Sequence, residues 1–123
     1  MKYDVANRLI WLKGEILNVN SAKINVLSPT SQFGLNVFEG IPCYWNDKNK
    51  QLYAFRLDDH YTRLKKSARL LQIDCPFTQE DMKKALIDVV KANEYYENIS
   101  VRQTLFVDGF GSWGADGPVE MFV

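Results

Sequence analysis

The sequence predicts an α+β fold: a mainly antiparallel sheet of about six strands, with two helices packed on one face. Short apolar runs separated by polar turns indicate strands that follow one another as hairpins. Two amphipathic stretches come consecutively in the middle of the chain, and their apolar residues recur at helical spacing. Strands joined by hairpins, together with a consecutive pair of helices, are typical of an antiparallel sheet covered on one side. At 123 residues the chain has the length of a single domain.

The N-terminal third predicts a hairpin and a third short strand. Leu9–Leu12 and Glu15–Val19 are apolar runs on either side of a Lys-Gly turn, which indicates two paired strands. Ala22–Leu27 alternates between apolar and polar residues, so a third strand is expected there. Ser28–Asn36 is polar, contains a glycine and is expected to be a loop.

The central part predicts a hairpin that runs directly into the first helix. Val37–Trp45 and Gln51–Phe55 are the expected strands, and Pro42 favours a bulge or an edge position because it lacks a backbone donor. Asp58 stands where an N-cap belongs, so the helix is expected to begin there. Its apolar face consists of Tyr61, Leu64, Ala68 and Leu71.

The second half begins with a clear helix start. Thr78 is the expected N-cap and Asp81 stands at N3, a variant of the capping box, and the helix should end near Tyr95. Its buried stripe consists of Met82, Ala85, Leu86, Val89 and Val90. Ile99–Val107 alternates as a strand, and Val119–Val123 begins a last strand.

The composition argues against several classes of function. A formal net charge of zero gives no overall field that would recruit nucleic acid or an anionic membrane. No apolar run approaches the length of a membrane span, and the N-terminus lacks the apolar core of a signal peptide, so a cytoplasmic protein is expected. One histidine, His60, and two cysteines, Cys43 and Cys75, do not supply a usual metal site.

Two arginines are the candidate anion ligands. Arg63 lies one residue before the apolar Leu64, so it borders the buried face of its helix; the alternatives are a solvated charge or an ion pair with Asp59. Arg102 lies on the mixed face of its strand, where a cross-strand ion pair is the alternative. Glu39 is unusual inside a strand, and the sequence does not name its partner. No lysine and no nucleophile–base pair is placed for chemistry, so no catalytic residue is predicted.

The stretch from Gly109 to Gly114 matches GxGxxG. A dinucleotide-binding fingerprint must open a helix, whereas this stretch leads into another predicted strand. We therefore expect a flexible glycine loop, or a mobile loop that lines a site in a partner subunit.

Three segments in this order carry a resemblance to a known family: FGLNVFEGI, FRLDDHYTRL running into KKSARLL, and SVRQTLF, followed by the glycine-rich loop. Taken together, they resemble the N-terminal small domain of class IV (fold-type IV) pyridoxal-phosphate-dependent aminotransferases. The branched-chain amino acid aminotransferases are the most similar group. The resemblance spans nearly the whole chain, so residues 1–123 are expected to be one such domain.

The resemblance implies roles for particular residues. Arg63 is expected to bind the phosphate of pyridoxal 5'-phosphate, and Arg102 to help hold the substrate carboxylate. Phe38 is expected to line the substrate pocket, and Phe33 stands where branched-chain enzymes usually have a tyrosine that contacts the site. The loop 108–118 is expected to reach the active site of the other subunit of a homodimer.

The resemblance also leaves alternatives open. Those enzymes usually have Arg where Pro42 stands and Tyr where Ser100 stands, and this chain therefore lacks two of their polar contacts near the site. The family places its Schiff-base lysine in a C-terminal domain that this chain lacks, so the chain alone is expected to be inactive. The complete enzyme would transfer an amino group between an amino acid and a 2-oxo acid. The alternatives are a D-amino acid transaminase, an aminodeoxychorismate lyase-like enzyme, or a non-catalytic binding or interaction domain.

Overall fold

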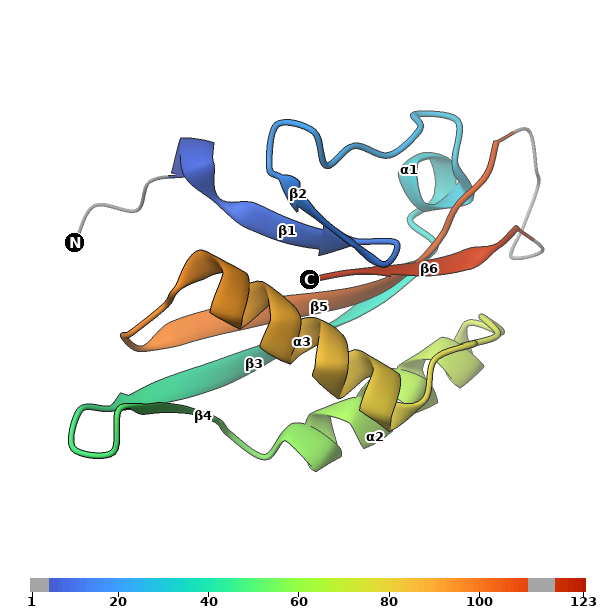
Figure 1. Ribbon diagram of the computed structural model, residues 1–123. Coiled ribbons are helices and arrows are strands. Elements are labelled where there is room, and N and C mark those ends of the chain that lie inside the picture. The colour runs from blue at the N-terminus through green and yellow to red at the C-terminus, as the bar shows by residue number, and fades with distance from the viewer. Residues whose placement is uncertain (1–4, 111–116) are drawn as a thin grey trace.

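A computed structural model describes residues 5–110 and 117–123, and these form one six-stranded antiparallel sheet with helices. The strand order is β2-β1-β6-β5-β3-β4, which confirms the predicted α+β class (Figure 1). The strands are β1 Leu9–Leu12, β2 Glu15–Asn18, β3 Asn36–Asn46, β4 Gln51–Ala54, β5 Ile99–Val107 and β6 Val119–Phe122. The helices are the 3-10 turn η1 Val5–Asn7 and the α-helices α1 Pro29–Phe33, α2 Leu57–Leu70 and α3 Gln79–Asn93.

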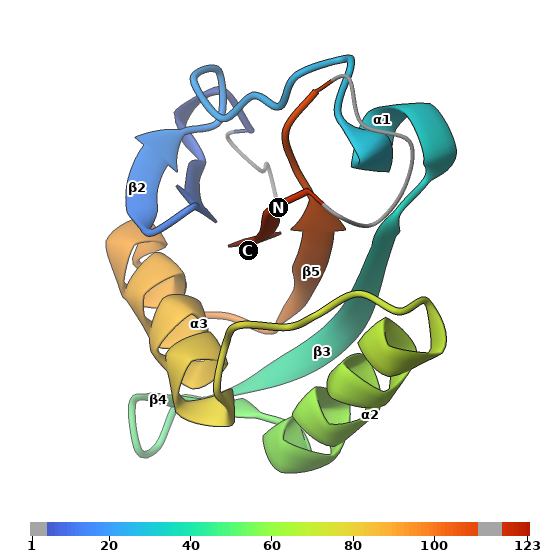
Figure 2. The same ribbon diagram turned by 90° about the vertical axis from the view of Figure 1, so that its right-hand side faces the viewer.

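The two long helices pack on the same face of the sheet, as the sequence predicted. α2 lies against β3 and α3 against β1, and Figure 2 shows the curved sheet with both helices in the lower part of the view. Their apolar stripes enter the core, with Tyr61 and Leu64 from α2 and Met82 and Ala85 from α3 almost completely buried. Full burial of one large apolar side chain stabilises a fold by about 1.5–3 kcal/mol. Leu71 was wrongly placed in this stripe: it is 44% exposed because α2 ends at Leu70.

The start of α2 differs from the sequence-based expectation, and the start of α3 agrees with it. Arg56, with a φ of 50°, is the N-cap of α2, so Asp58 lies in the first turn, where its charge still suits the helix dipole. In α3, Thr78 Oγ1 accepts from Asp81 N and the Asp81 carboxylate accepts from Thr78 N, which completes the capping box. α3 ends at Asn93, two residues before the expected Tyr95.

Two predictions for residues 22–36 were wrong. Ala22–Leu27 is not a strand, because Asn25 folds it into a local turn by accepting from Leu27 N, and no strand lies beside it among the described residues. The expected loop 28–36 contains the short helix α1. Its signals were present in the sequence: Ser28 caps the helix, Pro29 occupies its first position, and Gly34 ends it with a φ of 66°.

β3 pairs with β5 without interruption, from Asn36 opposite Phe106 to Cys43 opposite Ile99. The bulge suggested for Pro42 is therefore absent from this pairing. Pro42 lies instead where β4 ends, and its carbonyl accepts from Phe55 N. Pro42 has no backbone N–H, and the hydrogen bond that it cannot donate would have gone to the end of a short edge strand. The loss of this one bond therefore costs little stability.

Candidate functional site

Neighbouring side chains of β3 point to opposite faces of the sheet. Glu39 faces the helices, because its carboxylate contacts two side chains of α2. Phe38 faces the other side, where the guanidinium of Arg102 lies over its ring. The two arginines that the sequence singled out therefore lie on opposite faces of the sheet, each in contact with one of two consecutive β3 residues.

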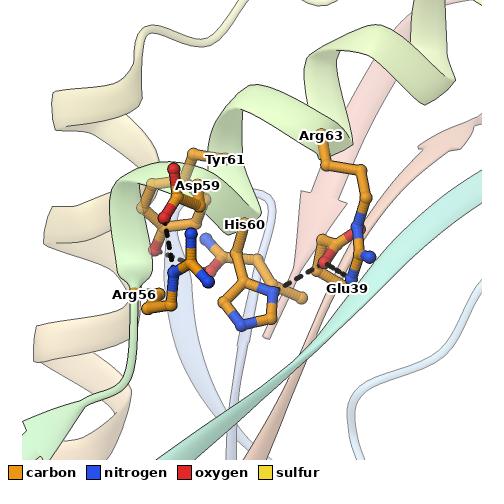
Figure 3. A network of polar contacts seen from close by, with 7 residues as sticks. Glu39, Arg56, Asp59, His60, Tyr61 and Arg63 are labelled. Carbon is orange, nitrogen blue, oxygen red and sulfur yellow. Dashed lines mark hydrogen bonds and ion pairs between the residues drawn. The ribbon is translucent and has the colours of Figure 1, made fainter.

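Arg63 forms a bidentate ion pair with Glu39 (Figure 3). Its Nε donates to Oε2 at 2.8 Å and its Nη2 donates to Oε1 at 2.7 Å. The carboxylate is 5% exposed, whereas the arginine side chain is 68% exposed. The ion pair thus joins a buried carboxylate to a guanidinium that solvent reaches. The alternative pairing of Arg63 with Asp59 does not occur, because Asp59 pairs with Arg56.

His60 completes this cluster. Its Nδ1 lies 2.7 Å from Oε1 of Glu39, and it must donate the proton because an ionised carboxylate only accepts. Burial raises the pKa of Glu39, but hydrogen bonds from Arg63 and His60 outweigh it and hold this pKa below its usual value near 4.5. The same pair raises the pKa of Arg63. Glu39 is therefore ionised at neutral pH, with three N–H groups directed at its two oxygens.

Arg102 lies directly opposite Gly40 in the pairing of β3 and β5. Its guanidinium carbon is 3.7 Å from the centre of the Phe38 ring, a close cation–π contact that orients the guanidinium plane. A Cβ added at Gly40 would meet no atom of the described residues within 4 Å. On the face of β3 that carries Phe38, the described residues therefore leave open space at the strand position opposite Arg102.

The N-terminal half of β3 also presents a sheet edge. β4 pairs with β3 only from Cys43 onward, so no other described strand lies beside residues 36–41 on that side. Leu35 O accepts from Val107 N, so the backbone N–H and C=O groups of odd-numbered residues along β3 point toward β5. Pro42 O accepts from Phe55 N, so those of even-numbered residues point toward the β4 side. The backbone groups of Phe38 and Gly40 consequently point toward the open edge. Arg63 and Arg102 thus contact β3 from its two faces, next to edge positions that pair with no other described strand.

Phe33 and the loop 108–118 are the remaining predicted features. Phe33, half exposed, ends α1 three residues before β3 begins. The loop 108–118 is held at its ends by a bond of 2.8 Å from Asp108 N to Pro118 O and by an ion pair between Lys13 and Asp108. Trp113 and most of the GxGxxG stretch fall outside the described residues.

Two kinds of feature are absent from the described residues. In that part of the chain, no helix has both the length and the apolar character needed to cross a membrane. Nor does any cluster of three or more His, Cys, Asp or Glu side chains there have the arrangement of a metal site.

Sequence reasoning missed the cluster that Glu39 forms with His60 and Arg63. A signal existed, because an acidic residue on the core-facing side of a strand requires a buried partner. His60 and Arg63 are three residues apart on α2 and so share a helix face. Only the packing of α2 on β3 shows that this face meets Glu39.

Comparison with known proteins places this geometry in a family. A family model described as Amino-transferase class IV matches residues 36–123. The probable branched-chain-amino-acid aminotransferase of Aquifex aeolicus is 30% identical over 92 residues, which is 75% of this chain and 30% of the relative. The Escherichia coli K12 branched-chain-amino-acid aminotransferase is 32% identical over 102 residues, covering 83% of this chain and 32% of the relative.

Solved structures give the same result for the fold. The branched-chain aminotransferase of Thermoproteus uzoniensis, crystallised with norvaline, has a TM-score of 0.85 at 36% identity and covers 94% of this chain and 39% of that one. The branched-chain amino acid aminotransferase of Thermobaculum terrenum, crystallised in its PLP-bound holo form, has a TM-score of 0.82 at 29% identity. That match covers 97% of this chain and 39% of the solved one.

The chain therefore belongs to the class IV aminotransferases, as its sequence segments indicated. Within that family its relatives are branched-chain amino acid aminotransferases, and it corresponds to their N-terminal portion. It spans about a third of the length of the curated relatives that it matches.

Proposed function

We propose that this chain is the small domain of a pyridoxal-phosphate-dependent aminotransferase that transfers an amino group between a branched-chain amino acid and a 2-oxo acid. The observation that carries the proposal is the guanidinium of Arg63, which is accessible to solvent and fixed on a buried carboxylate. Family membership and the branched-chain relatives give the proposal its substrate class.

The residues present fit the phosphate of the cofactor. Glu39 uses Nε–H and one Nη2–H of Arg63, and an arginine carries five N–H groups in all, so three donors remain for a second anion. Guanidinium groups bind phosphate bidentately through such parallel donors. Pyridoxal phosphate, when bound, supplies an electron sink for the bonds at the substrate α-carbon. Arg63 has the role of binding and orienting it.

On the other face of β3, Arg102 is proposed to orient the substrate carboxylate. The stacked Phe38 ring fixes its guanidinium plane, and the absence of a side chain at Gly40 leaves room for a ligand beside it. Phe38 and Phe33 are proposed to exclude water from around an apolar substrate side chain, since both have a large exposed apolar surface.

The solved relatives are more than twice as long as the part that this chain covers. We propose that the lysine that carries the cofactor lies in a C-terminal domain that packs on this one, and that the enzyme is a homodimer. Exposed aromatic residues support such partners: Phe38, Tyr44, Tyr53 and Phe55. The 123-residue chain alone is expected to be inactive, and borohydride reduction with cofactor should label no single lysine stoichiometrically. A cytoplasmic location stays a prediction.

The test is the affinity of the complete enzyme, which joins this chain to the cofactor-bearing domain, for pyridoxal phosphate. Arg63→Met should weaken it by about one to two decades, the usual effect of losing a charge-assisted hydrogen bond. Affinity for pyridoxal, which lacks the phosphate, should change little. Arg63→Lys should restore part of the loss, because a point charge does not reproduce the fork.

The matched control is Arg69→Met, because Arg69 is an exposed arginine in the last turn of the same helix. It should leave both affinities unchanged. If Arg63→Met binds pyridoxal phosphate as tightly as the unmodified enzyme does, Arg63 is a structural partner of Glu39 and the proposed cofactor site is wrong.

A further inference from the structure

We propose that Glu39 is a positioning residue for the cofactor phosphate: it holds the Arg63 guanidinium in one orientation, with its unused donors turned toward the ligand. This inference rests on the proposed function of Arg63. It assigns a role in cofactor binding to a residue that touches no ligand itself.

The geometry of the ion pair carries the inference. Glu39 binds Arg63 at Nε and Nη2, which lie along one edge of the planar guanidinium. The three remaining N–H groups, two on Nη1 and one on Nη2, lie on the sides turned away from that edge. One hydrogen on each Nη atom points in parallel, which is the arrangement that binds two phosphate oxygens. Binding to Glu39 therefore selects the edge that stays available.

The difference in burial shows which partner holds the other. Glu39 belongs to a paired strand and its side chain is 5% exposed, whereas the side chain of Arg63 is 68% exposed. An exposed arginine samples many rotamers, and ordering it on ligand binding costs entropy. A buried carboxylate that accepts two of its N–H groups has already restricted those rotamers. The site is thus preorganised before the phosphate arrives.

Glu39 is itself held from a second direction. Nδ1 of His60 donates to Oε1 at 2.7 Å, the same oxygen that accepts from Nη2 of Arg63. A carboxylate with donors on both oxygens has a fixed plane, and the plane of the carboxylate sets the plane of a bidentate guanidinium. His60 therefore supports the orientation of the Glu39 carboxylate and, through it, that of the Arg63 guanidinium (Figure 3).

The negative charge of Glu39 could have the opposite effect on cofactor affinity from the orientation that it imposes on Arg63. A carboxylate close to a phosphate repels it, and the ion pair also offsets the charge of Arg63. If charge dominated, removing the carboxylate would tighten cofactor binding. If orientation dominates, removing it weakens binding, because the guanidinium is then free to rotate away.

The experiment is a double-mutant cycle on pyridoxal phosphate affinity in the complete enzyme, with pyridoxal as the phosphate-free probe. Glu39→Gln keeps the size of the side chain but turns one accepting oxygen into an amide donor that faces Arg63. It should weaken pyridoxal phosphate binding by about tenfold, less than Arg63→Met does, and leave pyridoxal binding unchanged. In the Arg63→Met background it should have no further effect, because Glu39 acts only through Arg63.

Glu15→Gln is the matched control, since Glu15 is an exposed glutamate on the edge strand β2, and it should leave both affinities unchanged. An unchanged or tighter affinity in Glu39→Gln, together with a loss in Arg63→Met, overturns the inference and leaves the proposed function standing. An unchanged affinity in Arg63→Met overturns both. If Glu39→Gln weakens the binding of pyridoxal phosphate and of pyridoxal equally, the inference is also overturned, because such a result indicates a structural role for Glu39.

A second measurement needs no stable variant. In the unmodified apoenzyme, the Nε–H of Arg63 should give a slowly exchanging ¹⁵N resonance at neutral pH, which shifts when pyridoxal phosphate is added. The exposed Arg69 should give none. An Arg63 Nε–H that exchanges as fast as that of Arg69 shows an unrestrained guanidinium and overturns the inference.

Discussion

The hydroxyl of Tyr61 donates a hydrogen bond of 2.8 Å to Oε1 of Gln103, and both side chains are almost completely buried. The amide of Gln103 donates in turn to the carbonyl of Met82 at 2.8 Å and contacts the sulfur of Met121. One strand residue therefore links α2, α3 and β6 through its side chain. Burial also raises the pKa of Tyr61 far above its ordinary value, so the phenol remains a donor at every physiological pH.

Removing the hydrogen bond between Tyr61 and Gln103 should destabilise the protein, because it leaves a buried polar group without a partner. Gln103→Leu should lower the free energy of unfolding by about 1–3 kcal/mol, because the Tyr61 hydroxyl is left buried without a partner. Adding Tyr61→Phe should recover part of that loss, since both polar groups are then gone. Urea unfolding of the two single variants and the double variant measures the effect. Additive losses in the double variant would show that the two side chains are not coupled.

Gly117 and Gly40 should respond differently to the same substitution. A Cβ at Gly117 would lie 2.5 Å from the backbone oxygen of Asp108, so Gly117→Ala should force the base of the loop apart and cost about 1–3 kcal/mol. The added methyl group of Gly40→Ala meets no described atom within 4 Å, so this substitution should change stability by less than about 0.5 kcal/mol. Thermal unfolding of both variants tests this difference. Equal melting temperatures for Gly117→Ala and Gly40→Ala would contradict the prediction.

The stability contributed by Glu39 should depend on pH in a defined direction. Because hydrogen bonds from Arg63 and His60 hold its folded pKa below the ordinary value of 4.5, ionised Glu39 favours the folded state. This contribution is present above pH 4.5 and is lost as the pH falls through the lower folded pKa. The difference in unfolding free energy between unmodified protein and Glu39→Gln should therefore shrink below pH 4.5. A difference that grows on acidification contradicts the assignment.

The two cysteines should differ in reactivity. Burial raises the pKa of Cys43 to about 11, whereas Cys75 is only partly buried. A thiol reagent at about pH 8 should label Cys75 first, and Cys43 only as the protein unfolds. Since the folded pKa of Cys43 lies above its ordinary value of 9.0, its contribution to stability should decline as the pH rises from about 9 to 11. Cys43→Ala should remove that alkaline slope.

Local sequence signals predicted most of the secondary structure. The capping box at Thr78 and Asp81, the alternation of Ile99–Val107 and the helical spacing of Tyr61, Leu64 and Ala68 depend on neighbours a few residues away. Where two local signals competed, the prediction failed. Alternation at Ala22–Leu27 indicated a strand, but the side chain of Asn25 turns the backbone there.

The sequence by itself determined the family, the α+β class, and the two arginines as the candidate anion ligands, because these depend on residue types in a fixed order. Only the tertiary structure decided that Glu39 and His60 meet Arg63, that Arg102 stacks on Phe38, and that the arginines lie on opposite faces of β3. Glu39 and Arg63 are 24 residues apart. Such a contact depends on how α2 is packed against the sheet, and that arrangement is set by the whole buried core.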